Sequence, residues 1–213
     1  MPGAGRIGPM STHPPPSFWD QNYGASTGFK YGERPNAFLV EQAVRFTPGS
    51  RILLPGDGEG RNGVWLAEQG HAAFSVDGSA VGLARAQDLA RRRGVTLHTT
   101  HAELADWSSE PAGFDAVVAI YLHLPPALRT AVHRKLVQAL RPGGLLVLEA
   151  FHPSQLPLAS GGPKDVAMLY TLELLRADFA GLRELLAEET DTVLDEGPGH
   201  QGPARVTRWV GQR

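Results

Sequence analysis

The feature that most constrains the fold is an uninterrupted apolar run over residues 116–122, which directly follows Phe114 and Asp115. A strand that is apolar on both faces is typical of a parallel sheet covered by helices on both sides. The run is much shorter than the ~20 apolar residues that cross a bilayer. We therefore expect a buried strand over 114–122 inside an α/β domain, and no membrane partner.

Segments with strand and helix patterns alternate around this run. Short apolar strands are expected over 51–54, 72–76, 95–99 and 145–150. Helices are expected over 35–46, over 60–70, from the N-cap Ser79 to Arg93 before Gly94, and over 128–140. Repeated alternation of this kind predicts a Rossmann-like, doubly wound and mostly parallel sheet.

The last part of the chain has a different pattern. A helix is expected from the N-cap Thr171 to Phe179, and an extended or mixed segment over 182–193 follows it. A turn is expected over 197–199, and residues 204–210 alternate like a half-exposed strand. These signals predict a C-terminal antiparallel hairpin on the otherwise parallel sheet.

Length and composition limit the classes of function. A chain of 213 residues suits one domain, expected over 17–213 after a Gly- and Pro-rich tail over 1–16 that we expect to be disordered. The absence of cysteine excludes disulfides and cysteine-ligated zinc. A net charge of −2 provides no strong field for a phosphate backbone, so nucleic acid is not an expected partner. No secretory signal is visible, so we expect a cytoplasmic protein; its oligomeric state is left open.

A glycine-rich loop follows the first predicted strand and precedes a helix. Glycine permits positive φ and close approach of a ligand, and free N–H groups at a helix start receive anionic groups. Gly56, Gly58 and Gly60 form the pattern G-x-G-x-G, whereas Gly58, Gly60 and Gly63 form the dinucleotide pattern G-x-G-x-x-G. The first glycine should stand at the carboxyl end of the strand, which favours the pattern that begins at Gly56.

Acidic residues follow the next two strands. Asp77 ends the second strand, 17 residues after Gly60, where a carboxylate accepts the ribose hydroxyls of a nucleotide cofactor. Glu103 and Leu104 follow the third strand, where they would bind an adenine amino group and pack on its ring. The alternatives are that Asp77 only begins the turn before the next helix and that Glu103 is an exposed loop carboxylate.

Taken together, the glycine loop, Asp77, Glu103, the strand over 114–119 and the turn over 140–144 resemble class I S-adenosylmethionine-dependent methyltransferases in order and spacing. The likeness covers about residues 50–151. Within this class the chain is similar to the tellurite-resistance and thiopurine methyltransferase branch. That second likeness rests on the segment Phe18-Trp19-Asp20 with Tyr23, on residues 31–36 and on residues 161–170.

The resemblance implies a seven-stranded sheet, S-adenosylmethionine as cofactor and a small-molecule methyl acceptor, with a sulfur, selenium or tellurium nucleophile as the first expectation. The loop would hold the amino-acid end of the cofactor, Tyr121 would lie beside the sulfonium, and Trp19, Tyr23 and Tyr31 would form a lid. The predicted cofactor-binding residues are Trp19, Tyr31, Gly56, Asp57, Gly58, Gly60, Asp77, Gly78, Glu103, Leu104 and Tyr121.

One position departs from the family pattern. The family often has an acid two positions before the first glycine, and here Leu54 stands there, followed by Pro55. The hydrogen bonds of that acid must come from elsewhere or be absent.

Methyl transfer from a sulfonium is an in-line displacement that depends mainly on holding donor and acceptor in position. His123, which lies just after the 114–122 strand, is the candidate general base. The alternative is a loop histidine with a structural hydrogen bond. A metal site is not expected, because His98 and His101 lie across a strand end and not on one helix face.

Two other functions stay open. An NAD-linked enzyme would use Gly58, Gly60 and Gly63, but the sequence lacks the second mononucleotide-binding half of a dinucleotide fold. A non-catalytic cofactor-binding module of the same fold would explain the missing acid at Leu54.

Overall fold

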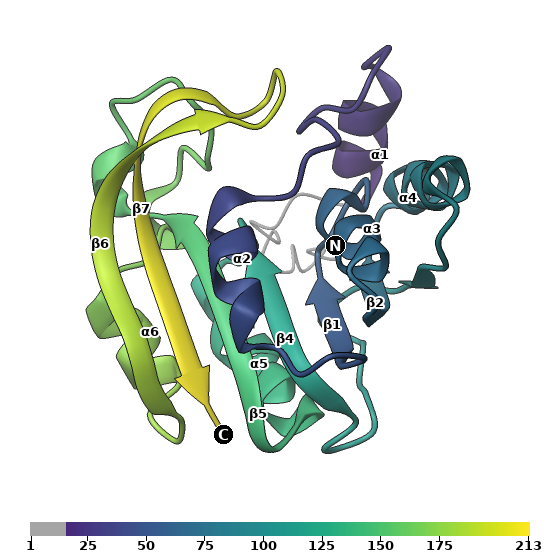
Figure 1. Cartoon of the computed structure of the whole chain (residues 1–213). Helices are drawn as coiled ribbons and strands as arrows, with labels where there is room; N and C mark the ends of the chain where they lie inside the picture. The colour runs from purple at the N-terminus through teal and green to yellow at the C-terminus, as the bar shows by residue number, and fades with distance from the viewer. Residues whose placement is uncertain (1–15) are drawn as a thin grey trace, which may run out of the picture.

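The computed structural model describes residues 16–213, and its centre is a seven-stranded sheet in the order β3-β2-β1-β4-β5-β7-β6 (Figure 1). β1 to β5 pair in parallel, and β7 runs antiparallel to both its neighbours, β5 and β6. The predicted Rossmann-like sheet with a C-terminal antiparallel hairpin is therefore confirmed. The strands are β1 Arg51–Pro55, β2 Ala72–Asp77, β3 His98–His101, β4 Phe114–Ile120, β5 Leu140–Phe151, β6 Arg183–Asp195 and β7 Gln201–Gln212.

Helices cover both faces of the sheet (Figure 1). They are α1 Pro16–Gly24, α2 Ala37–Gln42, α3 Arg61–Glu68, α4 Ala80–Arg93, α5 Pro126–Ala139 and α6 Leu172–Asp178, with short 3-10 turns at Ala43–Arg45, Pro153–Gln155 and Val166–Met168. The tail predicted over 1–16 lies outside the described residues, apart from Pro16, which begins α1.

The central strand β4 explains the apolar run in the sequence. Its residues Ala116 and Val118 pack into a core shared with α2, α3 and α4, whereas Val117 and Ala119 pack into a core shared with α5 and α6. All four side chains are almost fully buried. After Asp115, β4 is therefore apolar on both faces, as the sequence predicts.

Local capping signals fix the helix ends. The Ser79 hydroxyl accepts a hydrogen bond from the Gly82 N–H at 3.0 Å, and the Thr171 hydroxyl accepts one from Leu174 N–H at 3.2 Å. Gly94 ends α4 with a left-handed φ of 70°. The predicted N-caps and glycine C-cap are confirmed.

The third strand begins three residues later than predicted. Gly94 and Val95 donate to the carbonyls of Arg91 and Ala90, so they complete the end of α4. The ladder with β2 starts only at His98, opposite Phe74. The sequence of residues 95–97 is compatible with a strand. The N–H group of Val95 is already bonded to α4, so it is not available for a ladder with β2.

The fifth strand begins earlier than predicted, at Leu140, because it contains an irregularity. Leu140 pairs with Phe114, but the next pair joins Leu145 to Ala116, so the register with β4 shifts across the Pro-Gly-Gly segment.

In the described part of the chain, no helix is both long and apolar enough to cross a membrane.

Candidate active site

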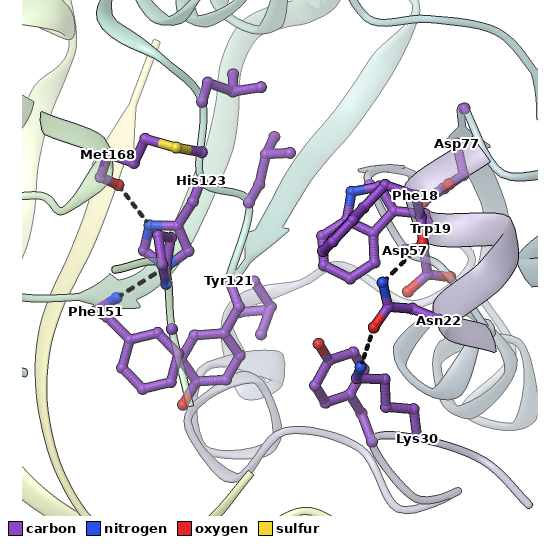
Figure 2. Close-up of a pocket in the computed structure, with 18 of the residues that line it drawn as sticks. Phe18, Trp19, Asn22, Lys30, Asp57, Asp77, Tyr121, His123, Phe151 and Met168 are labelled. Atoms are coloured by element: carbon purple, nitrogen blue, oxygen red, sulfur yellow. Dashed lines mark hydrogen bonds between the residues drawn. The ribbon is translucent and has the colours of Figure 1, made fainter. Parts of the chain in front are cut away.

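The carboxyl ends of β1, β2 and β4 open into a cavity of about 530 Å³. This volume is in the range of small-molecule sites, and the carboxyl edge of an open α/β sheet is where such folds bind ligands. Figure 2 shows Trp19 and Asp57 across the cavity from His123 and Phe151. Ten predicted site residues line it: Trp19, Tyr31, Gly56, Asp57, Asp77, Gly78, Glu103, Leu104, Tyr121 and His123.

The glycine loop between β1 and α3 is held open by left-handed backbone. Gly56, Gly58 and Gly60 have φ values of 68°, 57° and 81°, a region that is unfavourable for other residues. The Gly56 N–H donates to the carbonyl of Val76 at 2.7 Å, which attaches the loop to β2. The glycines therefore set the shape of the loop at the floor of the cavity.

Gly58 and Gly60 are not among the residues that line the cavity. A Cβ on Gly58 would overlap the Tyr23 hydroxyl, and one on Gly60 would lie 2.5 Å from the Ala86 side chain. These two glycines thus permit the close packing of α1 and α4 on the loop. Among the three, Gly56 faces the cavity.

Asp77 ends β2 at the cavity wall and is buried. One carboxylate oxygen accepts from Gly58 N–H and the other from Ser79 N–H, both at 2.8 Å. Burial raises the pKa of Asp77, and these two backbone donors oppose the rise. Each oxygen keeps a second lone pair, so the carboxylate can still accept hydroxyl donors.

Gly78, Glu103 and Leu104 form the next part of the wall. A Cβ on Gly78 would overlap the carboxylate of Glu103, so the missing side chain lets this acid approach the end of β2. Leu104 is buried beside it. A carboxylate next to an apolar side chain suits a ring that carries an amino group.

Asp57 is the buried acid of the loop. Its Oδ2 accepts from the Ser75 hydroxyl at 2.6 Å and from Gly63 N–H at 3.3 Å. Within residues 16–213, its Oδ1 is enclosed and has no hydrogen-bond partner. Burial raises the pKa of Asp57 to about 7, and the charge of Asp77 adds to the rise. Oδ1 of Asp57 is therefore an acceptor whose hydrogen-bonding capacity is not used by the described residues.

The aromatic residues predicted to form a lid, Trp19, Tyr23 and Tyr31, line the cavity. Trp19 of α1 stacks on Tyr23 with ring centroids 5.7 Å apart, and both line the cavity. Asp20 accepts from the Ser79 hydroxyl at 2.6 Å and from Val81 N–H at 3.2 Å, which fastens α1 to the start of α4. Tyr31 lines the cavity from the segment that follows α1.

Tyr121 follows β4 with a φ of 52°, which is unusual for a residue with a side chain. Its ring stacks on Phe151 with centroids 4.6 Å apart, and its hydroxyl donates to Glu149 at 2.8 Å. Strained backbone of this kind concentrates at functional sites. The hydroxyl is occupied, so the ring is what Tyr121 presents to the cavity.

His123 lies in the cavity wall, but both of its ring nitrogens are engaged. Nδ1 donates to the carbonyl of Met168 at 2.7 Å, and Nε2 accepts from Phe151 N–H at 3.2 Å (Figure 2). Burial lowers the pKa of His123 to about 4. In this arrangement the imidazole has no free lone pair, so His123 cannot take a proton as the predicted general base unless a structural hydrogen bond breaks.

Arg61 lines the cavity and belongs to a buried polar network that the sequence analysis did not predict. Arg61 forms an ion pair with Glu196 at 2.8 Å, and Asn36 donates to both Glu196 and Glu149 at 2.9 and 2.7 Å. Arg61 directly follows the glycine loop, so its position next to the cavity could have been predicted from the sequence. Glu196 comes from the turn between β6 and β7, and nothing in its local sequence marks it as a partner of Arg61.

The described residues contain no group of three or more His, Asp or Glu side chains arranged to hold a metal ion. His98 stacks on Phe74 with centroids 4.5 Å apart, and His101 contacts the carbonyl of Gly78 at 3.0 Å. The two histidines thus have separate contacts.

Comparison with known proteins agrees with this geometry. Residues 52–144 match a family described as a methyltransferase domain. A 2-heptyl-1-hydroxyquinolin-4(1H)-one methyltransferase of Mycobacteroides abscessus is 26% identical over 119 residues, which are 54% of this chain and 52% of that protein. The chain thus aligns with about half the length of this curated relative.

Residues 52–144 match a methyltransferase domain, and the sheet that contains them has the fold of class I S-adenosylmethionine-dependent methyltransferases.

Solved structures share the fold of this methyltransferase domain. A protein studied for the conversion of a disulfide bond into a thioacetal group during echinomycin biosynthesis has a TM-score of 0.75 at 18% identity, over 92% of this chain and 91% of its own. TehB from Haemophilus influenzae has a TM-score of 0.68 at 14% identity, over 92% of this chain and 67% of its own. Likeness at these identities shows the fold alone.

The cavity of the methyltransferase domain fits S-adenosylmethionine, the cofactor that this family implies. The orphaned Oδ1 of Asp57 is an acceptor for an ammonium group. Asp77 retains lone pairs for hydroxyl groups, and the Glu103 carboxylate lies against Gly78 at the cavity wall. A nucleoside that carries an amino acid needs donors and acceptors of these kinds. The alternative NAD pattern consists of Gly58, Gly60 and Gly63, none of which lines the cavity, whereas Gly56 of the favoured pattern does.

Proposed function

We propose that the chain is an active enzyme that transfers a methyl group from S-adenosylmethionine to a small-molecule acceptor in the same cavity. The observation that carries this proposal is a single cavity with two unlike walls. One wall holds the glycine loop, Asp77 and Glu103, and the opposite wall is aromatic, with Tyr121 and Phe151. The proposal takes residues 17–213 as one domain that works in the cytoplasm.

The residues of the first wall would bind and orient the cofactor, which supplies a methyl group activated by its positive sulfur. Asp77 would accept the ribose hydroxyls, Glu103 and Leu104 would hold the adenine, and Asp57 would accept from the ammonium group. Trp19 and Tyr31 would cover the site and exclude water. Holding two reactants in line contributes ~7–11 kcal/mol in well-oriented systems, so this chemistry needs few reactive side chains.

The second wall favours a neutral, largely apolar acceptor. It combines the aromatic rings of Tyr121 and Phe151 with the soft sulfur of Met168. Arg61 is neutralised by Glu196, so this cation is not free for an oxyanion. Lys164 also lines the cavity, but it is exposed, so solvent screens its charge. We infer that thiols and selenols suit the cavity better than tellurium or selenium oxyanions. The relative from Mycobacteroides abscessus is a methyltransferase of 2-heptyl-1-hydroxyquinolin-4(1H)-one.

We also propose that the domain belongs to the tellurite-resistance and thiopurine methyltransferase-like branch. Its support is the aromatic lid near Trp19, the segment over 31–36 and the segment over 161–170, which all contribute residues to the cavity. TehB is among the proteins of similar fold.

The first experiment is calorimetric binding of S-adenosylhomocysteine, with NAD as the control. We expect micromolar binding of S-adenosylhomocysteine and no binding of NAD. Binding of NAD alone would contradict the proposal and favour a nucleotide-linked redox enzyme.

The role of Asp77 gives a sharper test. Asp77→Ala removes hydrogen bonds to a charged acceptor that contribute ~1.5–3 kcal/mol, so S-adenosylhomocysteine should bind ~10- to 100-fold more weakly. Asp106→Ala is the control, because Asp106 is an exposed acid in the loop next to Leu104. Equal affinity of the parent and Asp77→Ala proteins would rule out the ribose assignment.

An acceptor screen separates an enzyme from a non-catalytic binding module. Thiols, selenols, hydroxyquinolones, amines, and tellurium and selenium oxyanions would be tested with labelled S-adenosylmethionine. We expect methylation of an apolar thiol or a hydroxyquinolone. Tight cofactor binding without turnover of any acceptor would identify a non-catalytic module, and preference for an oxyanion would contradict the acceptor class inferred above.

A further inference from the structure

A second histidine lies in the cavity, on the turn that joins β6 to β7. His200 is only 5% exposed, and its Nδ1 lies 3.4 Å from Oε2 of Glu196. A carboxylate only accepts hydrogen bonds, so this contact places the ring proton on Nδ1 and leaves a lone pair on Nε2. Within residues 16–213, Nε2 makes no hydrogen bond and is not a fully enclosed atom.

Aromatic neighbours fix the orientation of the His200 ring. Its centroid lies 4.4 Å from Tyr31, 4.5 Å from Tyr121 and 5.2 Å from Phe151. These three residues also line the cavity. A ring held on several sides keeps its lone pair pointed in one direction, which is what proton transfer in a fixed geometry needs.

The Nε2 edge of the ring is kept clear by a glycine. A Cβ on Gly161 would lie 2.6 Å from Cδ2 and 3.1 Å from Nε2 of His200, and the φ of Gly161 is 132°. A side chain at this position would displace the ring or block its free nitrogen. The missing side chain at Gly161 therefore leaves the Nε2 edge of His200 uncovered at this point.

Glu196 is held as an ionised acceptor. Arg61 lies 2.8 Å from its Oε2, and the Asn36 amide donates to its Oε1 at 2.9 Å. Burial raises the pKa of Glu196, but the hydrogen bond from His200 and the charge of Arg61 outweigh burial and lower it to about 2. Glu196 thus remains a carboxylate at neutral pH and keeps the Nδ1–H form of His200.

We propose that His200 is the general base for the methyl acceptor and that Glu196 is the residue that positions it. This inference rests on the proposed methyl transfer. It assigns to His200 the role that the sequence suggested for His123, whose two nitrogens are both engaged. A carboxylate that orients a histidine while the other ring nitrogen faces the reactant is a recurrent catalytic arrangement.

In the proposed step, one proton moves to His200 and one methyl group moves to the acceptor. The acceptor loses the proton of its S–H or O–H bond to Nε2, and the freed electron pair forms the new bond to the methyl carbon. The bond between that carbon and the positive sulfur breaks, and its electrons stay on sulfur, which becomes neutral. His200 becomes an imidazolium stabilised by Glu196, and it later releases the proton to solvent. The acceptor is therefore a molecule whose nucleophile is protonated when it binds.

The surroundings of His200 set the expected pH dependence. Burial lowers its pKa, while Glu196 opposes that effect, so the imidazole is neutral at physiological pH. A neutral base loses activity as the pH falls through its own pKa. The titratable and charged groups that face His200 are Glu196, Glu149, Arg61, Tyr31, Tyr121 and His123. Among these, Glu196 makes the direct contact, so Glu196→Gln should alter the acid limb of the rate profile.

The kinetic test compares two thiols that each carry a benzene ring but differ in the ionisation of the thiol group. 4-Nitrothiophenol is already a thiolate at pH 7, whereas phenylmethanethiol is protonated and needs a base. Removing a general base lowers a rate by ~10²- to 10⁴-fold, so His200→Gln should lose at least ~100-fold in kcat with phenylmethanethiol and only a few-fold with 4-nitrothiophenol. Its cofactor affinity should not change, and its acid limb should disappear.

The matched control is His152→Gln. His152 also pairs with a glutamate, because its Nε2 lies 3.5 Å from Glu189, but it does not line the cavity. This variant should keep the parent rate with both thiols. An equal loss with both thiols in the His200→Gln protein, or no loss with either, would overturn the base assignment.

A measurement without turnover decides the tautomer. Long-range proton–nitrogen correlation spectra of the histidine rings distinguish Nδ1–H from Nε2–H, and the His200→Gln protein assigns the signal. We expect Nδ1–H for His200 in the protein bound to S-adenosylhomocysteine. An Nε2–H form would overturn the base assignment alone, whereas a parent protein that methylates no acceptor would contradict the proposed function itself.

Discussion

Leu54 and Asp57 make different contributions to the glycine loop. Leu54 fills the position at which the resembled family often has an acid, and its side chain is fully buried. Asp57, three residues later, places a carboxyl group beneath the same loop, with bonds to Ser75 and Gly63. The loop therefore keeps an internal acceptor, but that acceptor has fewer donors around it than its charge requires.

The stability of the protein should consequently depend on the protonation of Asp57. Its pKa in the folded protein is about 7, above its ordinary value of 3.8, so the folded state binds the proton more tightly than the unfolded state. The resulting stabilisation is complete below pH ~4 and is lost as the pH rises through ~7. The parent protein should therefore lose stability from pH 4 to 8, whereas Asp57→Asn, which has no carboxyl group to ionise, should not. The unfolding free energy of Asp57→Asn minus that of the parent should grow by ~1–3 kcal/mol over this range. Urea unfolding of both proteins across this range measures it, and a constant difference would contradict the shifted pKa.

The predicted site residues that line the cavity share a local signal. Gly56, Asp77 and Glu103 each follow a predicted strand, and the carboxyl ends of parallel strands meet at one edge of the sheet. His200 and Glu196 carry no such signal. They reach the cavity because β6 and β7 fold back beside β5, and their partner Arg61 is 135 positions away from Glu196.

Among the elements, the segment over 25–35, here called the strap, links α1 to α2 and carries Tyr31 into the cavity. Arg85 of α4 donates to the carbonyls of Gly28 and Ser26 at 2.8 and 2.7 Å, and it forms an ion pair with Glu59 at 2.7 Å. Glu59 in turn accepts from Lys30 N–H at 2.7 Å. These bonds hold the strap against the loop and α4.

Loosening the strap should speed ligand release. Arg85→Ala removes the two hydrogen bonds and the ion pair of Arg85, each worth ~1 kcal/mol, so S-adenosylhomocysteine should dissociate ~10- to 100-fold faster. Stopped-flow displacement measures the rate. Arg91→Ala on the same helix is the control, because Arg91 is 72% exposed and pairs only with Asp88 among the described residues. Identical dissociation rates in the Arg85→Ala and Arg91→Ala proteins would show that the strap does not limit release.

Element types were more predictable than element ends. The uninterrupted apolar run predicts β4 and the capping residues predict α4, because these signals act within a few residues. The start of β3 and the irregular start of β5 depend on which backbone groups neighbouring elements occupy. Such competition is decided by tertiary contacts and leaves no trace in a short stretch of sequence.

For the whole molecule, Trp209 of β7 joins the hairpin to the core. It is 1% exposed, stacks on Phe179 with centroids 5.0 Å apart and donates to Glu184 at 3.2 Å. Trp209→Ala should lower the free energy of unfolding by ~3–5 kcal/mol, as large core deletions do. Denaturant unfolding measures the change. Val193→Ala, at a β6 position 76% exposed, should change it by less than ~0.5 kcal/mol. Similar values for the two variants would contradict this account of the core.

The strand order also governs how the chain acquires its structure during synthesis. β7 is the last described strand to leave the ribosome, yet it lies between β5 and β6. Until it emerges, β5 has β4 on one side and a row of unpaired backbone groups on the other, with apolar side chains on both faces. An open strand edge of this kind is a template for pairing with another chain. Expression should therefore depend on how long nascent chains wait with this edge uncovered, so slow translation near the hairpin would favour aggregation.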